Sequence, residues 1–171
     1  MFSIKISAQN NRFVFEYKFA PDINQKDSLV KEIMYLDAKE TGSKFYSQQK
    51  FLKDSTMKAM LDQQLAMGGK NFNFKDDGMK SSVSYSVEKS YPDFKQKLHT
   101  SIGNTRLILA ETKEMKWKIL PQKEKIGEFM TQKATCDFGG RSWTAWFTTE
   151  IPIQDGPYKF HGLPGFIVKL E

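Results

Sequence analysis

The chain is poor in the residues that most often build local chemical sites. Its 171 residues include one cysteine, Cys136, and two histidines, His99 and His161. A single cysteine excludes an internal disulfide and a multi-cysteine metal site. The two histidines lie far apart in the chain, and neither belongs to a His-x-x-x-His pair, so there is no local pair of metal ligands. We therefore predict neither a bound metal nor a cofactor.

Arginine and long apolar runs are scarce as well. Only Arg12, Arg106 and Arg141 are arginine, so lysine supplies most of the net charge of +6. The lysines are scattered among acidic residues, whereas nucleic-acid binders concentrate their cations on one face, so we predict no nucleic-acid partner. No run approaches the roughly 18 apolar residues that a membrane-spanning helix needs, so we predict no transmembrane segment.

What the chain has in quantity is alternation of apolar and polar residues. Phe13, Phe15, Tyr17 and Phe19, for example, alternate with Val14, Glu16 and Lys18. This period of two indicates strands, and turn residues separate about nine to ten such runs. The pattern predicts a mainly β (α+β) domain, built as a curved antiparallel sheet or half-barrel packed on one helix.

The predicted helix covers residues 48–67. Glycine and proline are absent there, large apolar residues recur at spacings of three and four, and Gly68-Gly69 ends the pattern. We expect this helix to cover the concave side of the sheet. Its methionines would then fill gaps in the core, or else line an adaptable apolar groove.

The C-terminal stretch, residues 139–171, carries the most specific signals. Gly139-Gly140 separates two alternating runs, as a hairpin turn does. Two rigid turns then flank an aromatic segment, and we assign their residues to shaping the fold because proline fixes φ and glycine permits positive φ. These residues are Gly156, Pro157, Gly162, Leu163, Pro164 and Gly165.

Residues 143–168 resemble the GLPGLI family, a group of exported proteins from Bacteroidota. The closing motif reads GLPGFI here, Gly162 to Ile167, and WFTTEIPI and GPYKF precede it. The family has no established activity, so the resemblance implies only a fold and a location in the periplasm or cell envelope. It also implies further sequence after Glu171, that is, a domain truncated at its C-terminus.

At the other end, residues 1–8 read as a signal-peptide remnant. They are too short for a complete signal peptide, but Ile6-Ser7-Ala8 followed by Gln9 is typical of the end of one. The alternative is a short native N-terminus that forms a strand edge. We expect residues 9–171 to form a single domain, and a monomer.

Two functional hypotheses remain. The first is a non-catalytic module that binds an apolar ligand or an envelope protein, and the residues assigned to ligand binding are Arg141, Trp143, Trp146, Tyr158, Phe160 and His161. The second is a hydrolase-like enzyme in which Glu150 or Asp155 orients His161 as a general base. We assign no catalytic residue, because no nucleophile and no Gly-x-Ser-x-Gly motif accompanies the histidine, and we favour the first hypothesis. Arg141 has structural alternatives: stacking on Trp143 or pairing with Glu150 or Asp155.

Overall fold

The computed structural model describes residues 11–21, 29–68 and 81–171. This part of the chain forms ten strands and one helix. In chain order they are β1 (Asn11–Phe19), β2 (Val30–Lys39), β3 (Gly42–Ser47), α1 (Gln48–Ala66), β4 (Ser86–Ser90), β5 (Gln96–Ile102), β6 (Thr105–Glu111), β7 (Lys118–Ile126), β8 (Phe129–Phe138), β9 (Arg141–Thr148) and β10 (Phe166–Leu170). Residues 1–8, interpreted above as a signal-peptide remnant, lie outside the described residues.

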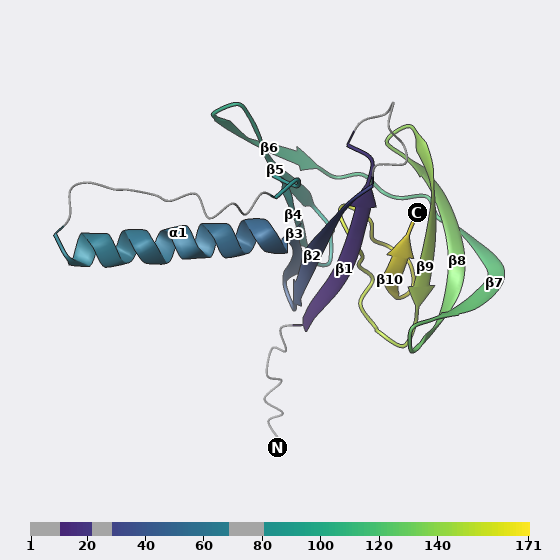
Figure 1. Cartoon of the computed structure of the whole chain (residues 1–171). Coiled ribbons are helices and arrows are strands. Elements are labelled where there is room, and N and C mark those ends of the chain that lie inside the picture. The colour runs from purple at the N-terminus through teal and green to yellow at the C-terminus, as the bar shows by residue number, and fades with distance from the viewer. Residues whose placement is uncertain (1–10, 22–28, 69–80) are drawn as a thin grey trace, which may run out of the picture.

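The strands form two antiparallel sheets. One has six strands in the order β1-β2-β3-β4-β5-β6, and the other has four in the order β10-β9-β8-β7. Figure 1 shows the two sheets side by side, with the C-terminal segments between them. The mainly β class, the number of strands and the single helix are thus confirmed. A half-barrel is not what forms, because the chain divides its strands between two separate sheets that do not close.

Alternation decides which residues face the other sheet. In β2, Met34, Leu36 and Ala38 are buried, whereas Tyr35 and Asp37 between them lie on the outer face. The register continues this division into β3, where Leu36 pairs with Phe45 and Asp37 pairs with Lys44. Successive side chains of a strand point to opposite faces, so the six-stranded sheet has an apolar inner face and a charged outer face.

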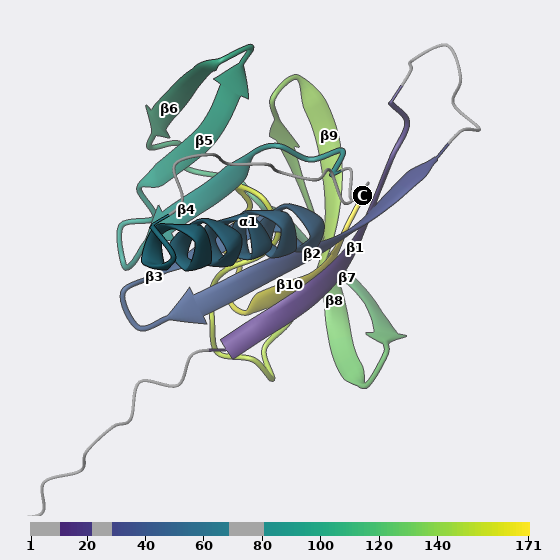
Figure 2. The same ribbon diagram turned by 60° about the vertical axis from the view of Figure 1, so that its left-hand side comes forward.

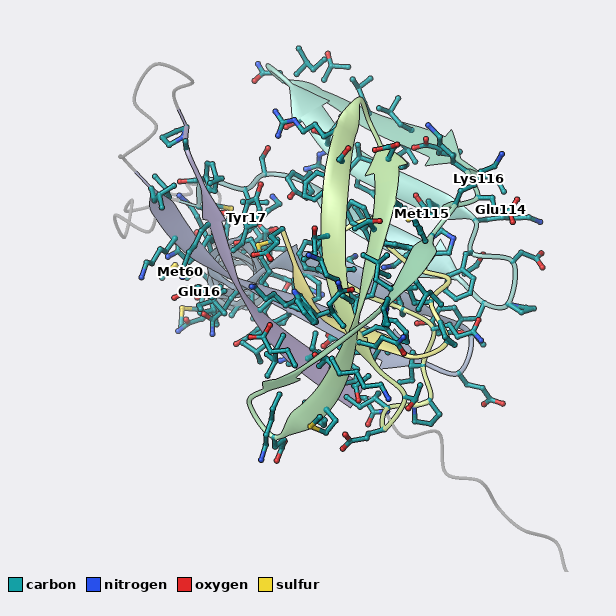
Figure 3. All side chains as sticks on the ribbon, turned by 90° about the vertical axis from the view of Figure 1, so that its right-hand side faces the viewer. Glu16, Tyr17, Met60, Glu114, Met115 and Lys116 are labelled. Carbon is teal, nitrogen blue, oxygen red and sulfur yellow. The ribbon has the colours of Figure 1, made fainter. Side chains whose placement is uncertain are left out.

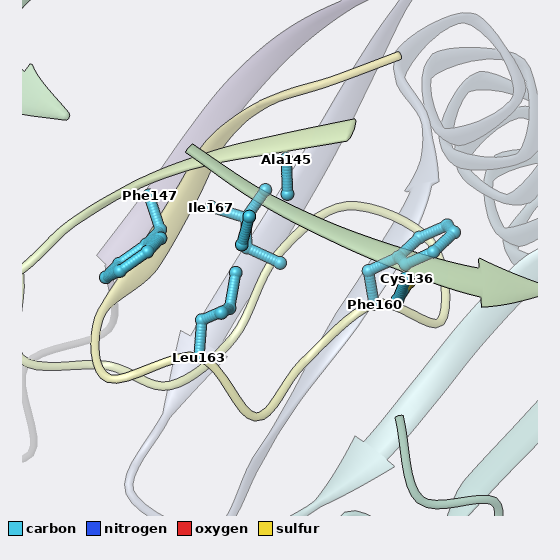
Figure 4. Close-up of a cluster of buried hydrophobic side chains, with 7 residues drawn as sticks. Cys136, Ala145, Phe147, Phe160, Leu163 and Ile167 are labelled. Carbon is cyan, nitrogen blue, oxygen red and sulfur yellow. The ribbon is translucent and has the colours of Figure 1, made fainter. Parts of the chain in front are cut away.

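The core consists of two clusters. The first joins the inner face of the four-stranded sheet to the segment after β9. It contains Ala134 and the buried residues labelled in Figure 4, namely Cys136, Ala145, Phe147, Phe160, Leu163 and Ile167. Met115, labelled in Figure 3, packs against this cluster from the segment before β7. The second cluster joins Met34, Leu36, Phe45, Val83 and Val87 of the six-stranded side to Phe166 of β10. Both sheets therefore share one interior.

The hairpin between β8 and β9 forms where the sequence predicts it. Gly139 and Gly140 have φ values of 61° and 75°, which suit a tight turn between twisted strands. The turn pairs Phe138 with Arg141 and Cys136 with Trp143. It therefore sets the register that sends Trp143 and Ala145 into the core.

Helix α1 begins at Gln48 because Ser47 caps it. The Ser47 hydroxyl accepts a hydrogen bond from the Lys50 backbone N–H at 3.1 Å and donates one to the buried carboxylate of Glu32. That carboxylate also accepts the Ser82 and Val83 amides at 2.9 and 3.1 Å. A single buried glutamate thus ties β2, the start of α1 and the strand region before β4 together.

The expected position of the helix is wrong. No residue of α1 is buried, and the helix stands on the outer side of the six-stranded sheet, away from the four-stranded one (Figures 1 and 2). The four-stranded sheet and the segment after β9 cover the inner face instead, so the core has no place for the helix. The methionines of α1 consequently do not fill gaps in the core.

Candidate functional site

The segment between β9 and β10, residues 149–165, lies between the two sheets. Phe160 and Leu163 pack against the four-stranded sheet in the first cluster. On the other side, Gln96 of β5 donates to the Lys159 carbonyl at 2.9 Å, and Tyr85 contacts Tyr158 edge-on with ring centroids 5.5 Å apart. We call residues 149–165 the interior segment. The inner position of its backbone explains its turn residues.

Two of the predicted motif glycines leave no room for a side chain. A Cβ on Gly165, whose φ is +155°, would lie 2.1 Å from the Thr148 carbonyl oxygen. A Cβ on Gly156 would lie 2.7 Å from the Ile167 side chain. Gly162 instead has open space around it but a φ of +88°, which glycine adopts at little cost. All three glycines therefore shape the interior segment.

A buried ion pair fixes this segment to the six-stranded sheet. The side chains of Lys89 on β4 and Asp155 are both 0% exposed, and they form a salt bridge. The Lys89 ammonium also donates to the Gly156 carbonyl at 2.6 Å, while the Asp155 carboxylate accepts from the Tyr91 hydroxyl and from the Gly156 amide at 2.7 Å. Burial lowers the pKa of Lys89, and the Asp155 charge acts in the opposite direction.

His161 lies beside this ion pair and is only 8% exposed. Its ring stacks on Phe94 with centroids 4.5 Å apart, and its Nδ1 lies 2.9 Å from the Lys159 carbonyl oxygen. The Gln96 side-chain nitrogen also lies 3.0 Å from Nδ1, so Nδ1 either donates to the carbonyl or accepts from the Gln96 amide, according to the tautomer. Burial lowers the pKa of His161, and the nearby Lys89 charge lowers it further. The imidazole is therefore held neutral at neutral pH.

The carboxylates predicted to orient His161 are engaged elsewhere. Asp155 binds Lys89 and Tyr91, as described above, and its backbone pairs with that of His161 in an isolated bridge, while its charge raises the pKa of His161 against the larger effect of burial. Glu150 accepts the Met130 amide at 2.9 Å. Neither carboxylate therefore holds the imidazole by a hydrogen bond, which is the arrangement that a general base of this kind requires.

The residues predicted to bind a ligand do not lie on one surface. Trp143, Tyr158 and Phe160 lie together. The centroid of the Phe160 ring is 4.9 Å from that of Trp143 and 6.4 Å from that of Tyr158. Trp146 is on the opposite face of β9, where the Lys133 ammonium lies 5.8 Å from its ring centroid. Arg141 is exposed at the tip of the β8–β9 hairpin. Ligand binding by these residues stays a prediction.

A pocket of about 680 Å³ lies on the outer face of the six-stranded sheet, at the base of α1. Its floor is formed by outward-facing residues of β2 to β5, and its wall by Lys50, Phe51 and Asp54 of the helix. The lining includes the lysines Lys39, Lys44, Lys95 and Lys97. The pocket between helix and sheet is thus lined with many charges, whereas the apolar-ligand hypothesis predicts an apolar cavity at this place.

The charges on the pocket floor form a ladder across the strands. Arg12 pairs with Asp37, Asp37 with Lys44, Lys44 with Glu88, and Glu88 with Lys97. Arg12 donates twice to Asp37, at 2.7 and 2.9 Å, and Lys44 lies 3.0 Å from Glu88. Each acidic group of the ladder therefore has a cationic neighbour on either side, and both ends of the ladder are positive.

Helix α1 exposes apolar side chains to solvent. Met57, Met60 (labelled in Figure 3) and Leu65 are exposed and Leu61 is half-buried, and their spacings of three and four place them on one side of the helix. Leu65 is 58% exposed and Met60 48% exposed. Among the described strands, β2 and β3 are the ones that pack against the helix by more than isolated contacts. The helix therefore presents an apolar stripe that the rest of the described chain does not cover.

The sequence interpretation missed the buried polar network and the pocket. Lys89 could have been found, because it occupies an inward position in the alternating run Val83, Tyr85, Val87, Lys89. A lysine in an apolar register is rarely buried without a partner. The pocket had no comparable signal, since its lysines come from four separate segments.

Two absences among the described residues bear on the kind of site. No group of three or more histidine, cysteine or acidic residues there is placed to hold a metal ion. No helix in the same part of the chain is both long and apolar enough to cross a membrane.

Comparison with known proteins gives a family match at the C-terminus. Residues 140–169 match the model of a family described as "Protein of unknown function (Porph_ging)". The match covers β9, the interior segment and most of β10. No curated protein matches the chain.

The fold is similar to a solved structure, "Structure of PNGF-II in C2 space group", with a TM-score of 0.57 and 10% sequence identity. The likeness covers 95% of this chain but 25% of that one. At this identity it shows a similar arrangement of strands and nothing about activity. The chain is therefore similar, over its last 30 or so residues, to a family of unknown function, and in its fold to a quarter of a larger protein.

Proposed function

We propose that this protein is a non-catalytic interaction module that binds another protein through helix α1. The observation that carries the proposal is a 19-residue helix with no buried residue and an apolar stripe facing solvent. Helices of globular proteins normally bury such a stripe, and a helix laid into a groove is a common mode of protein recognition. A protein partner is favoured over an apolar ligand because the pocket beside α1 is lined with charged groups.

The interior segment supports a structural rather than a catalytic role for the region around His161. The groups there are buried and paired with one another: Lys89 with Asp155, His161 with the Lys159 carbonyl, and Gln96 with the same carbonyl. A side chain that is 8% exposed gives a substrate little access in the free protein. The hydrolase alternative would require this segment to leave its place between the sheets.

The proposal includes export to the cell envelope. Its support is the resemblance of residues 143–168 to the exported GLPGLI family of Bacteroidota. Fractionation of the cells that produce the protein tests this part. The protein should appear with periplasmic or envelope markers, and its recovery with cytoplasmic markers alone would refute export.

Quantitative affinity capture tests the binding role. The tagged wild-type protein is compared with a variant in which three residues of the apolar stripe become glutamine: Met57→Gln, Met60→Gln and Leu65→Gln. The proposal expects at least one protein to be recovered with the wild type and lost with this variant, because the substitutions replace the contact surface without touching the core.

A matched variant controls for a general loss of surface hydrophobicity. It changes three exposed apolar residues outside α1: Val14→Gln, Ile119→Gln and Met130→Gln. This variant should retain the same captured protein. Recovery of the captured protein to the same extent with the wild type and both variants would contradict a specific role for α1. Its loss to the same extent with both variants would contradict that role as well.

A further inference from the structure

The pocket beside α1 has more positive than negative charge within reach. Five of its lysines extend from exposed positions, namely Lys39, Lys44, Lys50, Lys95 and Lys97, and its acidic residues are Asp37, Asp54 and Glu88. A sixth lysine, Lys89, lines the pocket with its backbone side only, because its ammonium is buried against Asp155 on the inner face. The lining therefore carries an excess of positive charge.

The acidic groups of the pocket are already engaged by cations. Asp37 accepts two hydrogen bonds from Arg12, and Glu88 lies 3.0 Å from Lys44. Asp54 lies 3.5 Å from Lys50. These contacts leave the carboxylates little capacity to neutralise further lysines.

Two lysines of the pocket, Lys39 and Lys97, form no close ion pair within the described part of the chain. Among the described residues, no carboxylate lies within 4.0 Å of the Lys39 or Lys97 ammonium, although the Lys39 charge helps to lower the pKa of Asp37. Lys97 ends the charge ladder on β5, with the small Ala110 as its neighbour on β6. Lys39 is on β2 in the next outward-facing position after Asp37. With β3 and β4 between them, β2 and β5 are about 14 Å apart.

The start of α1 adds to the positive potential. Ser47, the residue that caps the helix, lines the pocket, and the first turn of α1 contains no acidic residue. The N-terminal end of a helix carries a partial positive charge that favours anions. Phe51 of the same turn is 44% exposed and stands in the pocket wall, where it offers an apolar surface beside the lysines.

We propose that this pocket binds an acidic peptide segment of the protein partner, with two of its carboxylates placed on Lys39 and Lys97. The proposal rests on the proposed function, because it names the chemistry of the partner that α1 engages. An extended peptide rises about 3.3 Å per residue, so carboxylates about four residues apart would span the two lysines. A peptide is favoured over a small anion because the exposed lysines are spread over β2, β3, the start of α1 and the region of β5.

Fluorescence anisotropy of the purified protein with a fluorescein-labelled hexaglutamate peptide tests the inference. The Lys39→Gln/Lys97→Gln variant should bind the peptide about ten-fold more weakly than the wild type. The Lys123→Gln/Lys125→Gln variant on β7 removes the same charge elsewhere, so it should change the affinity less than about two-fold. Equal weakening in both variants, or no binding by the wild type, would overturn the proposal.

Two further arms separate this inference from the function it rests on. Inorganic phosphate should compete with the peptide only weakly; competition by phosphate at the same molar concentration would show a small-anion site and overturn the peptide assignment. Leu65→Gln changes the apolar stripe outside the pocket and should leave peptide affinity unchanged. If the protein fails to bind the peptide but still captures its partner through α1, the assignment of the pocket is refuted and the proposed function stands.

Discussion

Removing one charge of the buried Lys89–Asp155 pair should destabilise the whole domain. Asp155→Asn keeps the shape of the side chain but leaves the Lys89 ammonium without its counter-charge, in a position that is 0% exposed. Breaking a buried ion pair from one side costs about 3–5 kcal/mol, because the remaining charge is uncompensated. For a domain of this size, that loss lowers the melting temperature by roughly 6–20 °C.

Urea unfolding followed by tryptophan fluorescence measures the loss. Lys89→Met should cost a similar amount, since it leaves the Asp155 carboxylate with only the Tyr91 hydroxyl and the Gly156 amide. The double variant should cost less than the sum of the two single variants by about 2 kcal/mol or more, because it buries no unpaired charge.

A surface pair provides the comparison. Lys44 and Glu88 form an ion pair between neighbouring strands, 3.0 Å apart, but both are about half exposed, so removing either should cost less than about 1 kcal/mol. The reasoning fails if Asp155→Asn costs no more than Glu88→Gln. It also fails if the two changes at Lys89 and Asp155 are simply additive, because the pair would then not act as a unit that anchors the interior segment.

Three other predictions concern the interior segment and the exposed helix. Gly165→Ala should destabilise the domain by roughly 3 kcal/mol or more, because a carbonyl oxygen lies 2.1 Å from the Cβ position. Gly162→Ala, where the Cβ would meet open space, should cost only about 1 kcal/mol. Equal costs of the two variants in urea unfolding would refute the steric argument. Burial holds the pKa of His161 in the folded protein below its ordinary value of 6.5. As the pH drops through 6.5, His161 is therefore protonated in the unfolded chain before it is protonated in the folded protein, and the free energy of unfolding falls. His161→Gln should flatten this loss between about pH 7 and pH 5, and an unchanged slope in this variant would refute the argument. Leu65→Gln should change the free energy of unfolding by less than about 0.5 kcal/mol; a loss of about 2 kcal/mol would mean that the side chain is buried after all.

Much of the secondary structure could be predicted from the sequence, because local patterns determine it. The period of two in β1 and β2, the Gly139-Gly140 turn and the glycine-free run of α1 each act within about ten residues. These features predicted the number of strands and the single helix. The close approach of Gly165 to β9 was signalled by the Gly-Leu-Pro-Gly motif, although the partner atoms were not.

The packing of these elements could not be predicted in the same way. The apolar residues of α1 are equally compatible with a buried helix and with a docking helix, and only the packing of the second sheet excludes the first. The pocket depends on the register of β2 to β5, which places Lys39, Lys44 and Lys97 on one face from three distant segments. A single sequence contains no local signal for such a register.

The measurement that tests the central claim most directly is site-specific photo-crosslinking in the cells that produce the protein. A photoreactive phenylalanine analogue replaces Leu65 in the apolar stripe of α1, and in a second variant it replaces Ile119, an exposed residue of β7. Docking through α1 predicts a discrete protein adduct from the Leu65 position that is absent from the Ile119 position. No adduct at Leu65, or the same adducts at both positions, would contradict the account.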